Sequence, residues 1–224
     1  MIPWEKLDTA RIPGTDGELR LMRRGAEFSI MLGTNELMNS RLSGSEAALA
    51  TLAAKKIEKV AKPHVLIGGL GMGFTLRAAL GALGVGARIV VAELVPAIVV
   101  WARGPMAKIF GESLSDPRVD IRETDVTEII RSQRSKFDAI LLDVDNGPEG
   151  LTRQANDALY RSSGLKAAHA ALRPGGVLAV WSSGPNPPFS KRLADAGFDV
   201  NVVQIRATGG GRGARHVIWI ATKD

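Results

Sequence analysis

From residue 62 onward, short apolar runs alternate with stretches compatible with helices, and this alternation constrains the fold more than any other feature. The strand-like runs are VLIG (65–68), RIVVAE (88–93), VDIRE (119–123), FDAILLDV (137–144) and GVLAVWSS (176–183), and helices are expected over 74–83, 95–109, 126–133 and 157–172. Apolar strands that alternate with helices are typical of a parallel sheet buried on both faces. The sequence therefore predicts an α/β fold.

The last two strand-like runs, 199–207 and 215–222, have no helix between them. The loop TGGGRGA joins them, which favours an antiparallel hairpin. Five strand–helix units closed by such a hairpin resemble the Rossmann-like class I S-adenosylmethionine (SAM)-transferase fold. A dehydrogenase-type domain would continue with a sixth parallel strand instead. We therefore expect a mostly parallel seven-stranded sheet with a C-terminal antiparallel hairpin.

The N-terminal part has a different character. Residues 18–32 predict two short strands with a turn at Arg24-Gly25, and residues 43–60 predict a helix that opens on the capping box Ser43-Gly44-Ser45-Glu46. We interpret residues 1–60 as a small β-hairpin and helix cap, and residues 61–224 as a SAM-binding catalytic domain. A chain of 224 residues is long enough for one main domain with such an appendage.

Composition excludes several classes of protein. Cysteine is absent, which rules out disulfides and a thiol nucleophile, and only three histidines are present, so no metal site is expected. No apolar run is long enough to span a membrane and no signal peptide is evident, so we expect a cytoplasmic protein. The net charge of +6 comes from residues 151–224. Without interleaved aromatic residues, we interpret this excess as a solvated surface and expect no nucleic-acid partner.

A glycine-rich turn follows the first strand of the sheet, over residues 68–73 (GGLGMG). Glycines at a strand-to-helix turn let the backbone approach a ligand, and the following helix offers free N–H groups. The dinucleotide fingerprint GxGxxG fails here, since its last position is Phe74 or Leu76. The GxGxG spacing favours a SAM-type cofactor, and a tight turn without a ligand is the alternative. The predicted cofactor-binding glycines are Gly68, Gly69, Gly71 and Gly73.

Two carboxylates follow the next two strands. Glu93 ends the second strand, where an acidic side chain can accept hydrogen bonds from both ribose hydroxyls. Its alternative role is favourable interaction with the start of a helix. Asp125 follows the third strand, where SAM enzymes typically place a polar residue against the adenine amino group. Asp125 is also suited to cap the helix that begins near Val126, and the two roles are compatible.

The fourth strand runs into the acidic loop of FDAILLDVDNGPEG. Ligands of open α/β sheets lie outside the carboxyl ends of the strands, so Asp143 and Asp145 are expected near the reacting groups. An alkylamine is mostly protonated at pH 7, and a carboxylate can bind the ammonium and remove its proton. We predict Asp143 as general base and Asp145 as a residue that orients the acceptor. A solvated turn is the alternative.

Several segments between residues 16 and 185 resemble the spermidine synthase family: VLIGG, AELV, RETDV, LLDVDNGPEG and LRPGGVLAV. The resemblance implies transfer of an aminopropyl group from decarboxylated SAM to an amine, and a homodimer. It places Gly69, Gly71, Glu93 and Asp125 in the cofactor site. Asp143 takes the position of the family's amine-deprotonating aspartate.

The chain also departs from the family's pattern. Gly71 stands where the family has an aspartate that binds the aminopropyl ammonium, and Asn146 stands at the second catalytic aspartate. Of the family's polyamine-binding cluster only Glu46 remains, with Ser45 at the position of a histidine. In the family, the loop aspartate discriminates against the carboxylate of intact SAM. Because this chain has Gly71 at that position, intact SAM is also compatible with it.

The resulting prediction is a spermidine synthase-like transferase that moves an aminopropyl-type alkyl group from SAM or decarboxylated SAM to a small amine. Its substrate-site candidates are Glu46 and Tyr160. For Tyr160, the only tyrosine, packing beneath the acidic loop is an equal alternative. A SAM-dependent methyltransferase of a small molecule or RNA, and a non-catalytic SAM-binding module, are the alternative functions.

Overall fold

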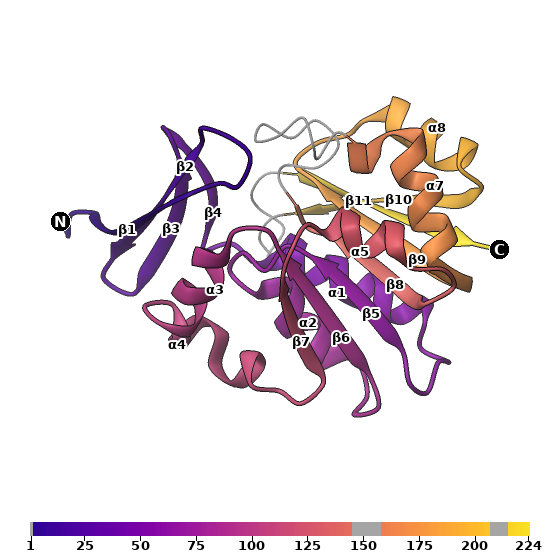
Figure 1. Ribbon diagram of the computed structural model, residues 1–224, viewed down its shortest axis with the longest axis horizontal. Helices are drawn as coiled ribbons and strands as arrows, with labels where there is room; N and C mark the ends of the chain where they lie inside the picture. The colour runs from indigo at the N-terminus through magenta and orange to yellow at the C-terminus, as the bar shows by residue number, and fades with distance from the viewer. Residues whose placement is uncertain (1, 145–157, 207–214) are drawn as a thin grey trace.

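The protein contains two β-sheets in the computed structural model, which describes residues 2–144, 158–206 and 215–224 (Figure 1). The small sheet is antiparallel with strand order β1-β2-β3-β4, and the seven-stranded sheet has the order β10-β11-β9-β8-β5-β6-β7. Strands β5 to β9 are mutually parallel, and β11 runs antiparallel to both β9 and β10. The prediction of a mostly parallel seven-stranded sheet with a C-terminal antiparallel hairpin is confirmed.

The strands of the large sheet lie close to the predicted ranges: β5 (His64–Gly68), β6 (Arg88–Glu93), β7 (Val119–Glu123), β8 (Phe137–Leu142), β9 (Leu172–Ser182), β10 (Phe198–Arg206) and β11 (Arg215–Lys223). Strand β8 lies at the centre of the order, and all six of its residues are buried. A strand covered on both faces has no solvent-facing positions, which explains its continuous apolar sequence.

Helices cover both faces of the large sheet, and the apolar core divides accordingly into two clusters. One cluster includes residues of α1 (Gly44–Lys56), α2 (Phe74–Ala82), α3 (Pro96–Arg103) and α4 (Ala107–Phe110). The short helix η1 (Gly111–Leu114) follows α4. The other cluster includes residues of α5 (Val126–Ser132), α7 (Ser162–Ala171) and α8 (Pro187–Asp195). The single helix predicted over 95–109 is wrong, because Gly104-Pro105 ends α3 at Arg103. Within the described residues, we find no helix long and apolar enough to cross a bilayer.

The N-terminal sheet is larger than the predicted two-stranded hairpin. Its strands are β1 (Glu5–Arg11), β2 (Glu18–Arg24), β3 (Glu27–Leu32) and β4 (Asn35–Asn39). The hairpin β2–β3 and its turn at Gly25 match the prediction, whereas β1 and β4 were not expected. Neither β1 nor β4 buries a residue fully, so the apolar alternation that reveals a half-buried strand is absent from their sequences.

Two features join the N-terminal sheet to the rest of the molecule. Leu21 and Ile30 are fully buried in the same core cluster as α1, α2 and α3. The indole Nε1 of Trp101 in α3 donates a hydrogen bond to the Asp8 carboxylate in β1, at 2.7 Å. These contacts hold the small sheet beside the loops at the carboxyl ends of the large sheet.

Helix α1 does not begin with the predicted capping box. Ser43 occupies the N-cap position but its side chain makes no capping hydrogen bond. Glu46 instead accepts a hydrogen bond from the neighbouring Ser45 hydroxyl, at 2.7 Å. The helix contacts α2 and strands β8 to β11 of the large sheet. The division of the chain at residue 60 therefore stays a prediction, with α1 as the element that links its two parts.

Candidate active site

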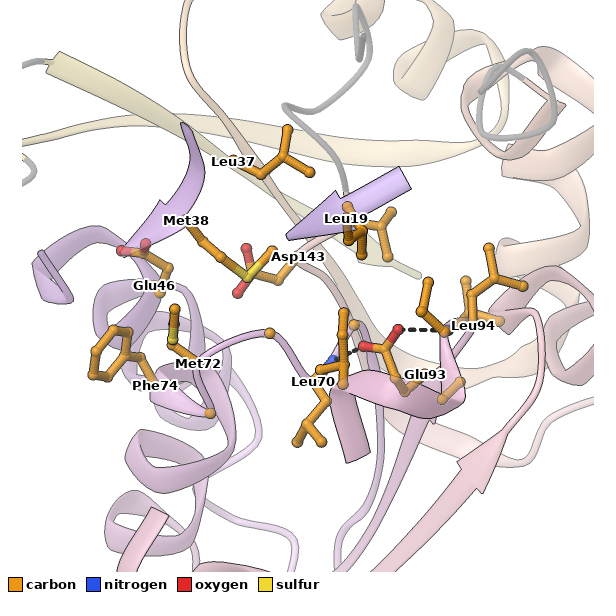
Figure 2. A pocket seen from close by; sticks show the side chains of 18 of the residues that line it. Leu19, Leu37, Met38, Glu46, Leu70, Met72, Phe74, Glu93, Leu94 and Asp143 are labelled. Carbon is orange, nitrogen blue, oxygen red and sulfur yellow. Dashed lines mark hydrogen bonds between the residues drawn. The ribbon is translucent and has the colours of Figure 1, made fainter. Parts of the chain in front are cut away.

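A cavity lies between the N-terminal sheet and the loops that follow β5, β6, β7 and β8 (Figure 2). The described residues that line it are Ile12, Leu19, Leu37, Met38, Asn39, Glu46, Gly69, Leu70, Gly71, Met72, Gly73, Phe74, Ala92, Glu93, Leu94, Val95, Ile98, Thr124, Asp125, Val126, Asp143, Val144 and Trp181. The fold thus brings seven of the residues predicted for the site into one cavity: Glu46, Gly69, Gly71, Gly73, Glu93, Asp125 and Asp143.

The glycine turn has a backbone that side chains would not permit. Gly69, Gly71 and Gly73 have φ angles of 91°, 50° and 75°, in the left-handed region that favours glycine. A Cβ atom at Gly69 would collide with the carbonyl oxygen of Asp143, and one at Gly73 would collide with the Phe110 ring. The turn therefore packs directly on the chain after β8, and its backbone forms one wall of the cavity.

We expect Gly69→Ala to destabilise the protein by at least ~2 kcal/mol, because left-handed strain of roughly 1–2 kcal/mol adds to the collision with Asp143. Gly81→Ala is the matched control, since a Cβ atom there meets nothing within 4 Å. That helical position should gain about 0.5–1 kcal/mol. Urea denaturation of both variants tests this prediction, and equal stability of Gly69→Ala and the wild type would contradict it.

Glu93 lies at the end of β6 and is only 5% exposed. Its Oε2 accepts a hydrogen bond from the Leu70 backbone N–H at 2.9 Å, and its Oε1 accepts one from Val95 N–H at 2.8 Å (Figure 2). Burial raises the pKa of Glu93, and the backbone N–H groups oppose this increase. The backbone N–H groups of Gly71 and Leu94 act on the pKa in the same direction. Glu93 therefore ties the glycine turn to β6 and lines the cavity.

Asp125 is the N-cap residue of α5. Its Oδ1 accepts hydrogen bonds from the backbone N–H and the hydroxyl of Thr127, at 2.8 and 2.7 Å. Asp125 also lines the cavity. Because both capping bonds go to Oδ1, Oδ2 is available to a ligand. The two roles considered from the sequence are thus geometrically compatible.

Asp143 follows the last residue of β8 at the centre of the site. Its Oδ2 accepts a hydrogen bond from the Thr75 hydroxyl at 2.7 Å. Burial raises the pKa of Asp143 to about 7, the nearby Glu46 carboxylate adds to this shift, and the Thr75 hydrogen bond opposes it. A carboxyl group with a pKa near 7 is suited to accept a proton at neutral pH. Thr75 was not predicted as a site residue, because a threonine shortly after a glycine turn carries no signal of such a role.

Two other predicted site residues, Gly68 and Tyr160, are not among the described residues that line the cavity. Gly68 is buried in β5, where Asp143 N–H donates to its carbonyl oxygen at 3.1 Å. Tyr160 is 2% exposed and packs edge-on against Phe189, with its hydroxyl 3.3 Å from the Val144 carbonyl oxygen. The structure therefore favours packing over acceptor contact for Tyr160. Asp145 lies outside the described residues.

The described lining of the cavity is acidic. It holds four carboxylates, Glu46, Glu93, Asp125 and Asp143, and includes no lysine, arginine or histidine. The Glu46 carboxylate, after burial, contributes to the raised pKa of Asp143. Apolar residues, among them Met38, Leu70 and Ile98, form much of the remaining wall. Such a cavity is complementary to a ligand that combines an apolar body with positive charge.

Sequence comparison relates part of the chain to two curated proteins. It is 33% identical over 120 residues to polyamine aminopropyltransferase 2 of Pseudomonas aeruginosa, a match that covers 52% of this chain and 32% of that protein. It is 30% identical over 117 residues to a polyamine aminopropyltransferase of Nitrosomonas europaea, covering 50% and 34%. The matches thus span about a third of each curated relative. No protein-family model matches the chain.

Structural comparison covers nearly the whole chain. The spermidine synthase of Thermotoga maritima superimposes with a TM-score of 0.77 and 17% sequence identity, over 98% of this chain and 73% of that one. A spermidine synthase in complex with the transition-state analogue AdoDATO also gives a TM-score of 0.77 and 17% identity, over 98% and 72%. The fold is therefore that of the spermidine synthases, a Rossmann-like fold with an N-terminal antiparallel sheet.

Proposed function

We propose that this spermidine synthase-like protein transfers an aminopropyl group from decarboxylated SAM to a small amine. The observation that carries the proposal is the position of Asp143, a partly buried carboxyl group with a pKa raised to about 7, in an acidic cavity. Both substrates of such a reaction are cations, and the described lining offers them four carboxylates. Similarity to polyamine aminopropyltransferases supports the same chemistry.

The residues present fit a SAM-type cofactor. Gly69, Gly71 and Gly73 line the cavity without side chains, so a ligand can approach the backbone of the turn. We propose that Glu93 binds the ribose hydroxyls and that Asp125 accepts a hydrogen bond from the adenine amino group. Apolar residues of the same lining, such as Val126 and Ile98, are suited to cover the adenine ring.

Glu46 and Asp143 would have different roles toward the amine acceptor. Glu46 binds the incoming ammonium by charge, and Asp143 removes one of its protons, which exposes the nitrogen lone pair. Thr75 holds Oδ2 of Asp143, so the proton is taken by the other carboxylate oxygen. The decarboxylated SAM supplies the electrophilic carbon: the nitrogen bonds to it as the carbon–sulfur bond breaks, and sulfur keeps the electron pair in methylthioadenosine. Holding the two reactants in line supplies much of the rate enhancement.

Incubation with decarboxylated SAM and a panel of short linear diamines and monoamines tests this proposal. We expect release of methylthioadenosine that depends on the amine, together with an acceptor that has gained one aminopropyl group, both detected by mass spectrometry. Boiled protein is the control. Tight cofactor binding without product from any amine would support the non-catalytic binding module instead.

One observation favours methyl transfer as the second candidate function. Gly71 brings no carboxylate to the glycine turn, and a Cβ atom there would lie 3.1 Å from the Met38 sulfur. The turn itself therefore contributes no negative charge against the carboxylate of intact SAM. Methylated amine from SAM in the same assay would support this candidate.

Two further properties are proposed: a homodimer, which the resemblance implies, and the cytoplasmic location expected from the sequence. Light scattering of the purified protein tests the first, and fractionation of the source cells tests the second. A monomer at micromolar concentration would contradict the first.

A further inference from the structure

A histidine from the C-terminal strand reaches the helix that carries Glu46. Nδ1 of His216, in β11, lies 2.9 Å from the hydroxyl oxygen of Ser45, at the start of α1. The Ser45 hydroxyl in turn donates to Oε2 of Glu46 at 2.7 Å. Ser45 is 1% exposed, so water scarcely competes for these bonds. Three side chains therefore form one hydrogen-bonded chain that ends at a carboxylate in the cavity wall.

The direction of this chain follows from the number of protons available. Ser45 has one hydroxyl proton and gives it to Glu46, so its oxygen accepts from His216. Burial lowers the pKa of His216, although the Glu46 charge opposes this. A neutral imidazole carries one N–H group, and this arrangement requires it on Nδ1. The Trp181 ring packs edge-on against His216, with 4.8 Å between the ring centroids, and fixes its orientation.

We propose that His216 and Ser45 are positioning residues that hold Glu46 for the amine acceptor, an inference that rests on the function proposed above. The Ser45 hydroxyl occupies Oε2, and no described residue bonds to Oε1 of Glu46, which is left for the substrate ammonium. Loss of these hydrogen bonds frees the Glu46 carboxylate to rotate away and weakens acceptor binding. It leaves Glu93 and Asp125, on the cofactor side, untouched. The effect should therefore fall on the KM for the amine.

Steady-state kinetics of four variants test the proposal. His216→Ala and Ser45→Ala should each raise the amine KM about tenfold, with kcat changed less than about threefold and cofactor affinity unchanged. The amine KM of the double variant should be no higher than that of either single variant, because each substitution breaks the same series of hydrogen bonds. His216→Asn should restore much of the KM, since its amide N–H can donate to Ser45. His169→Ala is the control: this histidine packs against Phe198, and it does not line the cavity.

Two outcomes would overturn the proposal. One is an unchanged amine KM in His216→Ala. The other is an equal loss of cofactor and amine binding with no rescue by asparagine, which would mark His216 as merely structural. A wild-type protein without amine-dependent turnover would instead overturn the proposed function, and with it a role in acceptor binding. Nitrogen-15 NMR of the histidine rings tests the chain separately: the proton is expected on Nδ1, and a proton on Nε2 alone would contradict the geometry.

Discussion

Replacing Asp143 with asparagine should lower kcat for amine transfer by about 10²- to 10⁴-fold, the range that a positioned general base contributes. Asparagine has the same shape and can still accept the Thr75 hydrogen bond, but it cannot take a proton from an ammonium group. Because Asp143 is assigned to the acceptor and not to the nucleoside, affinity for the cofactor should change little. Pre-steady-state measurement of product formation, beside calorimetric binding of the cofactor, separates the two effects.

Asp120→Asn is the matched control for this variant. It makes the same chemical change in an exposed carboxylate that pairs with Arg122 on β7, away from the cavity, and should leave kcat unchanged. Turnover of Asp143→Asn near the wild-type rate would contradict the assignment of the general base.

The folding stability of Asp143→Asn checks that its carboxyl group is as strongly perturbed as the structure indicates. The pKa is raised from 3.8 to about 7 on folding, so between these values the folded protein holds a proton that the unfolded chain has lost. The contribution of Asp143 to the free energy of unfolding therefore falls as the pH rises from about 4 to 7 and levels off above that. Relative to the wild type, the variant should gain up to ~4 kcal/mol between pH 4 and pH 8. Urea titrations at both pH values measure this difference.

The second large effect is a preference for decarboxylated SAM over intact SAM of about 100-fold. Intact SAM adds one carboxylate to a cavity whose described lining holds four carboxylates and no cationic side chain. Two like charges about 6 Å apart repel by about 3 kcal/mol at an effective dielectric constant of ~20, which corresponds to about 100-fold in affinity. The preference should increase as the pH rises through about 7, because Asp143 becomes ionised there.

Calorimetric titrations with the two cofactors at pH 6 and pH 8 measure this preference. Glu46→Gln should reduce it, since the variant removes one of the four carboxylates of the described lining. Equal affinities, or tighter binding of SAM, would contradict the electrostatic argument and favour methyl transfer, the function that the missing carboxylate at Gly71 leaves open.

The large sheet and the cofactor side of the cavity could be predicted from the sequence because their signals are local. The apolar runs reveal buried strands, and Gly69, Glu93 and Asp125 each lie at or just after the carboxyl end of a strand, at the same edge of the sheet. The predicted roles of these residues still await direct tests. The N-terminal strands β1 and β4 were missed because neither buries a residue fully and their sequences carry no periodic apolar pattern.

The acceptor side depends on contacts that no local pattern encodes. His216 and Ser45 are 171 positions apart, and only the packing of α1 against the C-terminal strands brings them together. The predicted capping box does not form: the Ser45 hydroxyl, which itself bonds to His216, donates to Glu46, and the Ser43 side chain makes no capping hydrogen bond. The pKa of Asp143 likewise follows from burial and from the nearby Glu46 charge, which the spacing of the two residues in the sequence does not reveal.

The most direct test of the central claim is the mass of the group transferred when the protein receives SAM and decarboxylated SAM together with a diamine. If the acidic cavity selects the decarboxylated donor and Asp143 deprotonates the acceptor, the diamine should gain an aminopropyl group and methylthioadenosine should be released in equal amount. A diamine that gains only a methyl group would contradict the proposed function.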